Sequence, residues 1–183
     1  VEIPDFSTLQ ALGIYGLTVV FGLFIMAFVF YPTLLLIFAK VNPIKFFRAI
    51  APAQLLAFST SSSAATLPVT MECVTENVGV DEEVSSFVLP LGATVNMDGT
   101  SLYQAVAAIF IAQAMLPNPL DLNTQLMIVV TATLASIGSA AVPSAGMVML
   151  VIVLGQAGIP EAGLALIFAI DRPLDMCRTV VNV

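Results

Sequence analysis

The stretches STSSSAATLP (59–68) and ASIGSAAVPSAG (135–146) each interrupt an uncharged and otherwise apolar run, 49–71 in the first case and 122–160 in the second. The apolar arms on either side are shorter than the roughly 20 residues that a helix needs to cross a membrane. A non-helical backbone segment with polar residues is tolerated within the membrane only where protein or a water-filled cavity covers it. The pattern predicts two re-entrant helical hairpins, and paired interrupted segments point to a transporter binding site. Two ordinary membrane helices kinked at glycine are the alternative.

The composition also indicates a membrane protein. Of the 183 residues, 59% are hydrophobic and 9% are charged, with a mean hydropathy of +1.04, which lies outside the usual range of soluble domains. The net charge of −7 argues against a nucleic-acid partner. The absence of histidine excludes a histidine triad or an imidazole proton relay. We expect Cys73 and Cys177 to be free thiols.

The first long apolar segment predicts a tilted membrane helix. Residues 11–39 carry no charge and would extend ~43 Å as a helix, which exceeds the ~30 Å hydrocarbon layer. Pro32 is a candidate kink. Lys40, Lys45 and Arg48 follow, whereas the short loops around the second hairpin contain no Lys or Arg. The positive-inside rule therefore places the loop 40–48 in the cytoplasm, so that the first hairpin enters from the cytoplasm and the second from outside.

Oxygen-rich residues between the hairpins suit a hard cation. LGATVNMDGTSLYQ (91–104) carries Asp98 as its only charge, and its glycine and asparagine residues predict an unwound segment at 92–98. Hard cations prefer carboxylate, amide and free carbonyl oxygens, so Asn96, Asp98 and the tip at 136–139 are candidate ligands. A transition-metal site is disfavoured, because the chain has no histidine and its two thiols are far apart.

The last segment, IDRPLDMCRTVVNV (170–183), places polar side chains on one helix face. The residues that share this face by their spacing are Asp171, Asp175, Arg178 and Asn182. Charged residues at membrane depth face protein or water and are functional candidates. Arg178 can bind a carboxylate through two nitrogens, and Asp175 can bind an ammonium group, a combination suited to an acidic amino acid. Alternatively, the two residues only neutralise each other. The hydroxyls that would complete such a site are those of Ser62, Ser63 and Thr179.

Four motifs resemble one transporter family. TSSSAATLPVT, LGATVNMDGTSLYQ, SIGSAAVPSAG and LDMCRTVVNV are similar to the dicarboxylate/amino acid:cation symporters, the glutamate and aspartate transporters, from about residue 10 to the end. The resemblance implies an all-α membrane protein and a partial transport domain covering residues 1–183. Its expected parts are a transmembrane helix (10–40), a re-entrant hairpin (43–80), an interrupted transmembrane helix (83–116), a second re-entrant hairpin (121–158) and a truncated last helix (160–183).

The resemblance also implies roles for individual residues. Ser62 and Ser63 would bind the substrate α-carboxylate, Thr100 and Arg178 the side-chain carboxylate, and Asp175 the ammonium group. The remaining substrate contacts would come from Thr179, Asn182 and the backbone of Ala141, Val142 and Gly146. The implied sodium ligands form three sets: Gly92, Asn96 and Asn182; Thr94 with Ser136, Ile137 and Ser139; and Asn96 with Asp98.

The expected activity is sodium-coupled symport of L-aspartate or L-glutamate by alternating access, with a proton as another possible coupling ion. The family further implies a multi-pass protein of the plasma or inner membrane and a homotrimer held by a scaffold domain, which we expect to be absent here together with the end of the last helix. Ser61 and Met176 stand where the family carries an arginine, and Arg172 either replaces it or points outward. A C4-dicarboxylate or neutral amino acid substrate, an ion channel and an intramembrane aspartyl protease using Asp98 and Asp175 are the alternatives.

Overall fold

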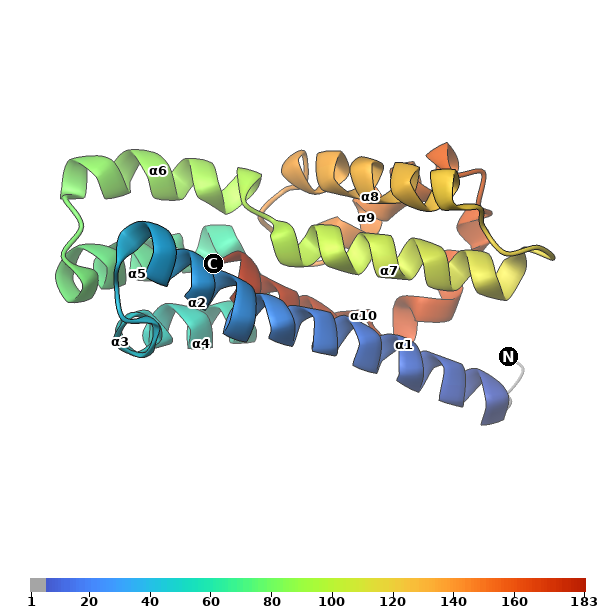
Figure 1. The fold of residues 1–183 in the computed structure, drawn as a ribbon, viewed down its shortest axis with the longest axis horizontal. Helices are drawn as coiled ribbons and strands as arrows, with labels where there is room; N and C mark the ends of the chain where they lie inside the picture. Colours follow the sequence, from blue (N-terminus) through green and yellow to red (C-terminus); the bar gives the residue numbers. More distant parts are fainter. Residues whose placement is uncertain (1–5) are drawn as a thin grey trace.

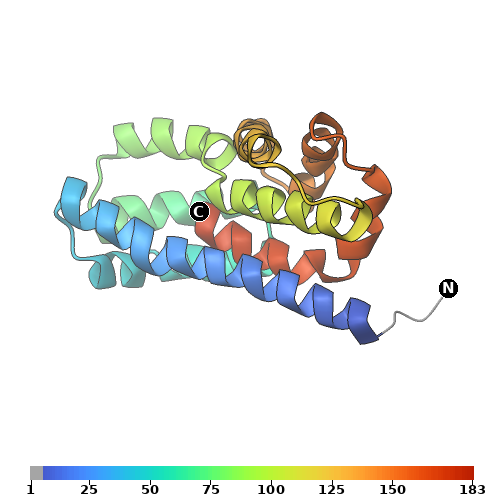
Figure 2. The same cartoon turned by 45° about the vertical axis from the view of Figure 1, so that its right-hand side comes forward.

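The computed structural model describes residues 6–183, and this part of the chain consists of helices joined by short non-helical segments, without a strand (Figure 1). The predicted all-helical class is therefore confirmed. The helices form one elongated bundle in which segments from both halves of the chain lie side by side (Figures 1 and 2).

The first helix runs along the length of the molecule. It is continuous over Phe6–Ala39, 34 residues, and is the one helix among residues 6–183 that is long and apolar enough to cross a membrane. It consists of α1 (Phe6–Ile25), a π-helical turn (Met26–Phe30), α2 (Tyr31–Leu34) and a second π-helical turn (Leu35–Ala39). The first wide turn lies directly before Pro32, whose ring cannot donate a helical hydrogen bond. α1 packs against α10 and α7 (Figure 2).

The first hairpin is built from α3 (Pro43–Ala49), α4 (Ala51–Thr60), α5 (Ser63–Glu72) and a π-helical turn (Cys73–Val78). The polar tip predicted at 59–68 is mostly helical, because only Ser61 and Ser62 lie between the two arms. Ser61 ends α4 with a left-handed backbone (φ 53°). The Ser62 hydroxyl then accepts a hydrogen bond from Ala65 N (3.1 Å) and so starts α5.

The segment between the hairpins consists of α6 (Glu82–Val95) and α7 (Asp98–Met115). The predicted unwound segment at 92–98 is too wide, since the helix continues through Val95 and only Asn96 and Met97 interrupt it. The second hairpin follows as α8 (Leu122–Ile137) and α9 (Ala145–Gln156), joined by a tip at 138–144. A 3₁₀ turn (Glu161–Gly163) leads into α10 (Leu164–Asn182).

α7 lies at the centre of the bundle and contacts α1, α8, α9 and α10. Its alanine-rich face, with Ala107 and Ala108 fully buried, lets these helices approach closely. α7 and α10 approach closely at Gly99, where a Cβ atom would come within 2.8 Å of the Arg178 carbonyl oxygen. α4–α5 and α8–α9 point toward each other from opposite ends of the molecule, and their tips meet beside α10 (Figure 1).

Candidate functional site

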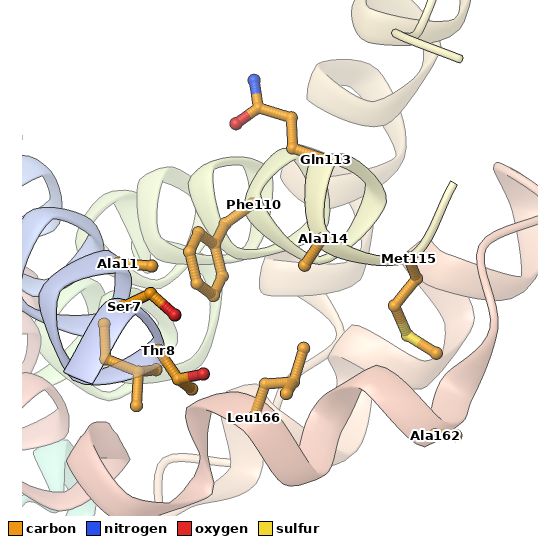
Figure 3. A pocket seen from close by; sticks show the side chains of 10 residues that line it. Ser7, Thr8, Ala11, Phe110, Gln113, Ala114, Met115, Ala162 and Leu166 are labelled. Atoms are coloured by element: carbon orange, nitrogen blue, oxygen red, sulfur yellow. The ribbon is translucent and has the colours of Figure 1, made fainter. Parts of the chain in front are cut away.

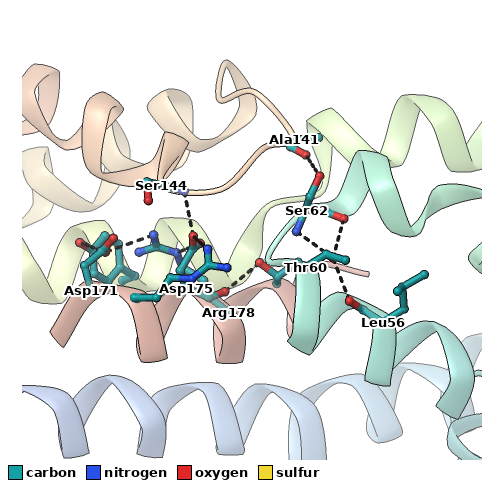
Figure 4. A network of polar contacts seen from close by, with 11 residues as sticks. Leu56, Thr60, Ser62, Ala141, Ser144, Asp171, Asp175 and Arg178 are labelled. Atoms are coloured by element: carbon teal, nitrogen blue, oxygen red, sulfur yellow. Dashed lines mark hydrogen bonds and ion pairs between the residues drawn. The ribbon is translucent and has the colours of Figure 1, made fainter.

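The tips of the two hairpins are in direct contact (Figure 4). The Ser62 hydroxyl donates a hydrogen bond to the carbonyl oxygen of Ala141 (2.7 Å), and Ala64 N donates to the same oxygen (3.2 Å). Ser62 therefore caps its own helix and also joins the first tip to the second.

A buried acid–base cluster on α10 lies beside this contact (Figure 4). Arg178 is 1% exposed, and its Nε donates to Asp175 Oδ1 (2.9 Å). On its other side, Arg178 Nη2 lies 3.2 Å from Asp171 Oδ1. The guanidinium stacks over the Tyr103 ring at 3.9 Å, and the Tyr103 hydroxyl donates to Asp171 (2.7 Å). The arginine is thus held on three sides by α7 and α10.

These contacts test the alternative that Arg178 and Asp175 only neutralise each other and bind no substrate. Their ion pair exists, and Nη2 is paired with Asp171, yet the buried Nη1 of Arg178 has no partner in the described part of the chain. Buried polar atoms without partners are rare in proteins and call for an explanation. The other such atoms of residues 6–183 are Ser61 Oγ, Ser139 Oγ and Gln104 Oε1, in the two tips and α7, and the hydroxyl of Tyr15 on α1.

The two tips, α7 and α10 enclose a small cavity of ≈ 20 Å³, which is about the space needed by one water molecule. Most of the predicted substrate-binding residues line this cavity: Ser63, Thr100, Ala141, Val142, Gly146, Asp175, Thr179 and Asn182. Two others lie directly behind the wall. Ser62 bonds to Ala141, and Arg178 Cζ lies 3.4 Å from where a Cβ on Gly146 would be. Val142 differs from the rest because half of its surface is exposed.

The first predicted sodium set lines a second cavity of ≈ 210 Å³, which Gly92, Asn96 and Asn182 share with Ser63 and Thr70. Asn182 connects the two cavities. Its Oδ1 accepts from Gly99 N (2.9 Å) and its Nδ2 donates to Thr100 Oγ1 (2.9 Å). The start of α7 is therefore tied to the end of α10.

The structure brings the residues of the other two predicted sodium sites together less completely. Ser136 and Ser139 are buried at the second tip, but Ile137 and Thr94 are exposed, and the Thr94 hydroxyl donates to Leu91 O on its own helix. The structure therefore does not direct Thr94 toward that tip. In the third set, Asn96 is exposed and Asp98 accepts a hydrogen bond from the Tyr31 hydroxyl (2.7 Å). Within residues 6–183, no three His, Cys, Asp or Glu side chains are grouped as a metal site.

Sequence reasoning left the role of Arg172 open and missed several residues. Arg172 is 53% exposed, and its Nη1 lies 3.9 Å from Asp175 Oδ2, so it reaches the binding face from the edge of the site. Ser144 N donates to the same oxygen (2.8 Å). Gln104 Nε2 donates to Gly146 O (3.0 Å) and so attaches α9 to α7. Gln104 lies one helical turn after Thr100, a spacing that could have revealed it.

A larger groove lies away from this cluster. It lies between the start of α1, the end of α7 and the start of α10 (Figure 3). Its volume is ≈ 570 Å³. Its lining is mostly apolar, with Phe110, Met115 and Leu166 beside the hydroxyls of Ser7 and Thr8. It has no charged side chain in its wall, and we assign it no part in substrate binding.

The two helical hairpins thus meet at their tips beside a buried acid–base cluster (Figure 4). The sequence profile of the Sodium:dicarboxylate symporter family matches residues 2–183, and the chain belongs to this family. It is 49% identical over its full length to excitatory amino acid transporter 3 of Homo sapiens, of which it covers 35%. It is 50% identical to excitatory amino acid transporter 5 of Mus musculus, with 95% of this chain and 31% of that protein aligned. The chain thus spans about a third of the length of these relatives.

Proposed function

We propose that the full-length protein is a sodium-coupled symporter of an acidic amino acid. The observation that carries the proposal is the Arg178 guanidinium, which is 1% exposed and whose Nη1 has no partner among the described residues, next to a cavity lined by both hairpin tips. A buried cation with unused donors is a site for a carboxylate. The names of the relatives, excitatory amino acid transporters, agree with an amino acid substrate.

In this proposal each charged group of the substrate has its own partner. Arg178 and Thr100 bind the side-chain carboxylate, Ser62 and Ser63 the α-carboxylate, and Asp175 the ammonium group. A C4-dicarboxylate lacks the ammonium group that Asp175 would bind, and a neutral amino acid would leave the donors of Arg178 unpaired, at a cost of about 1–3 kcal/mol. An aspartyl protease is not supported, because Asp98 and Asp175 bond to different partners, Tyr31 and Ser144.

The second tip is the proposed gate. The cavity of ≈ 20 Å³ is far too small for an amino acid, so one of its walls must move. The tip at 138–144 contains glycine, serine and proline and is irregular over its whole length, whereas the first tip is reduced to two residues. Opening of the longer tip would expose Arg178 and Asp175 to the outside. We also propose that both hairpins are re-entrant and that the protein is a multi-pass homotrimer of the cell membrane.

Sodium is the proposed coupling ion, with Gly92, Asn96, Asp98 and Asn182 as the core ligands. Thr94, Ser136, Ile137 and Ser139 would form a further site, which requires the Thr94 hydroxyl to leave Leu91 O. A tenfold sodium gradient supplies ~1.4 kcal/mol, and one charge crossing 100 mV supplies ~2.3 kcal/mol. These energies are adequate for concentrating a substrate. Coupling to a proton instead would show as uptake that follows the pH gradient.

The test is calorimetric titration of the full-length protein with L-aspartate, with sodium and with choline as the replacement cation. Binding in sodium and none in choline is the expected result. Equal affinity in both media would exclude sodium coupling. Uphill accumulation of L-aspartate in vesicles with an inward sodium gradient distinguishes a symporter from a channel, which can only equilibrate its substrate.

A further inference from the structure

We infer that the backbone N–H of Ser144 competes with the substrate ammonium group for Asp175. The inference rests on the proposed function, in which Asp175 binds that ammonium, and it concerns how the same site is kept closed. In the structure, Ser144 N donates to Asp175 Oδ2 at 2.8 Å, although Ser144 itself is exposed and Asp175 is 5% exposed (Figure 4). The bond therefore reaches from the surface of the second tip into the binding face of α10.

Both oxygens of the Asp175 carboxylate are used within the chain. Oδ1 accepts from Arg178 Nε (2.9 Å), and Oδ2 accepts from Ser144 N. Each carboxylate oxygen has two acceptor sites, so an incoming ammonium group competes only with the donor that lies in its path to Asp175. It could displace Arg178 only by leaving a buried guanidinium with fewer partners, at a high cost. Displacing Ser144 is easier, because an exposed residue at a loop tip can exchange its partner for water.

The backbone at Ser144 is adapted to this bond and not to an ordinary helix start. Ser144 lies in the left-handed region (φ 61°, ψ 5°), and its side chain makes no capping hydrogen bond to α9. Left-handed geometry is unfavourable for a residue with a Cβ atom, and it persists when surrounding contacts hold it in place. The charge-assisted bond to Asp175 is such a contact.

The N–H of Ser144 thus takes the position that the ammonium would take, and it closes the tip over a cavity of ≈ 20 Å³. When the ammonium binds Asp175, the tip loses this bond and must close on the substrate instead. Arg172 Nη1, 3.9 Å from the same oxygen, lies close enough to balance the Asp175 charge while the tip is open. Because the closed empty state competes with substrate, its stability lowers the apparent affinity.

The most direct test removes the N–H alone. In the full-length protein, Ser144 is replaced by its α-hydroxy acid, so that the backbone amide becomes an ester with the side chain retained. The matched control is the same replacement at Ala145, whose N–H bonds within the tip to Val142 O. We expect the Kd for L-aspartate in saturating sodium to fall about tenfold at position 144, the value of one charge-assisted hydrogen bond, and to stay unchanged at 145. An equal or higher Kd at position 144 would overturn the competition.

A second pair of variants uses ordinary mutagenesis. Ser144→Gly keeps the N–H and removes the left-handed strain, which stabilises the empty closed tip. The Kd for L-aspartate should therefore rise about fivefold, whereas Ala145→Gly should not raise it. If the two glycine substitutions change the Kd for L-aspartate equally, then the flexibility of the tip sets the Kd and the bond to Asp175 does not. If the unmodified protein does not bind L-aspartate in sodium, the proposed function fails; if it binds and neither pair differs, the competition alone fails.

Discussion

Replacing Arg178 by lysine separates the charge of this residue from its shape. Arg178 is 1% exposed and contacts Asp175 (2.9 Å), Asp171 (3.2 Å) and the face of Tyr103 (3.9 Å). Lysine keeps the positive charge, so the two carboxylates stay compensated and the fold is retained. A single ammonium group cannot reach both carboxylates and also offer two donors to a substrate.

The expected loss follows from these contacts. Losing one charge-assisted hydrogen bond to the substrate carboxylate costs about 1.5–3 kcal/mol, which weakens L-aspartate binding roughly 10–150-fold. Binding of L-serine, which has no side-chain carboxylate, should not weaken. Arg178→Cys should abolish the preference and also lower stability by about 3–5 kcal/mol, because Asp171 and Asp175 remain buried without a cation.

The assay is calorimetric titration of the full-length variants with L-aspartate and L-serine in sodium, together with the melting temperature. Tyr103→Phe is the control, since it keeps the ring beneath Arg178 and removes only the hydroxyl that bonds to Asp171. It should lower the melting temperature without changing the preference for L-aspartate. A folded Arg178→Lys protein that binds L-aspartate with the parental affinity would refute the assignment of Arg178 to the substrate carboxylate.

Three further variants test the surrounding structure. Gly146→Ala places a Cβ within 2.9 Å of the Thr100 methyl group. This overpacking should cost about 1–3 kcal/mol of stability and lower the melting temperature. The control Gly13→Ala, which has no atom within 4 Å of the new Cβ, should not lower it. Ser62→Ala removes the α5 cap and the bond to the second tip, so it should lower the free energy of unfolding in chemical denaturation by about 1 kcal/mol or more. A loss well below this value would contradict both roles. Asp98→Asn keeps an acceptor for Tyr31 but loses its charge, so the sodium concentration that half-saturates L-aspartate binding should rise more than about tenfold; an unchanged value would remove Asp98 from the sodium ligands.

The helices and the two hairpins could be predicted because their signals are local. Charge-free runs, short apolar arms and the Ser, Gly and Pro of each tip report on a segment and its immediate surroundings. The extent of each interruption could not be predicted. Composition marks a stretch as a poor helix former, but capping decides where the next helix starts. Ser62 begins α5 at residue 63, and the preceding helix continues through Thr60, so most of the predicted polar tip is helical.

Candidate binding residues could also be predicted from sequence where the residue type itself indicates a function, as for the charged Asp175 and Arg178 in an apolar segment. Ser144 carried no such signal, and for Gln104 only its position one helical turn after Thr100 indicated a role. Ser144 acts through a backbone N–H, which every residue except proline possesses, and Gln104 through an amide that bonds to a distant carbonyl. Their importance depends on which atoms of other helices lie within hydrogen-bond distance.

The sequence alone thus determined the helical class, the two hairpins formed by interrupted apolar segments and the charged face of α10. These features depend on periodicity and polarity, which are properties of neighbouring residues. Only the tertiary structure decided that Ala141 meets Ser62 and that Ser144 reaches Asp175. These contacts join residues far apart in the chain, and they depend on how the helices pack. The packing is set by close approaches such as that of Gly99 to Arg178, for which hydropathy and composition carry no signal.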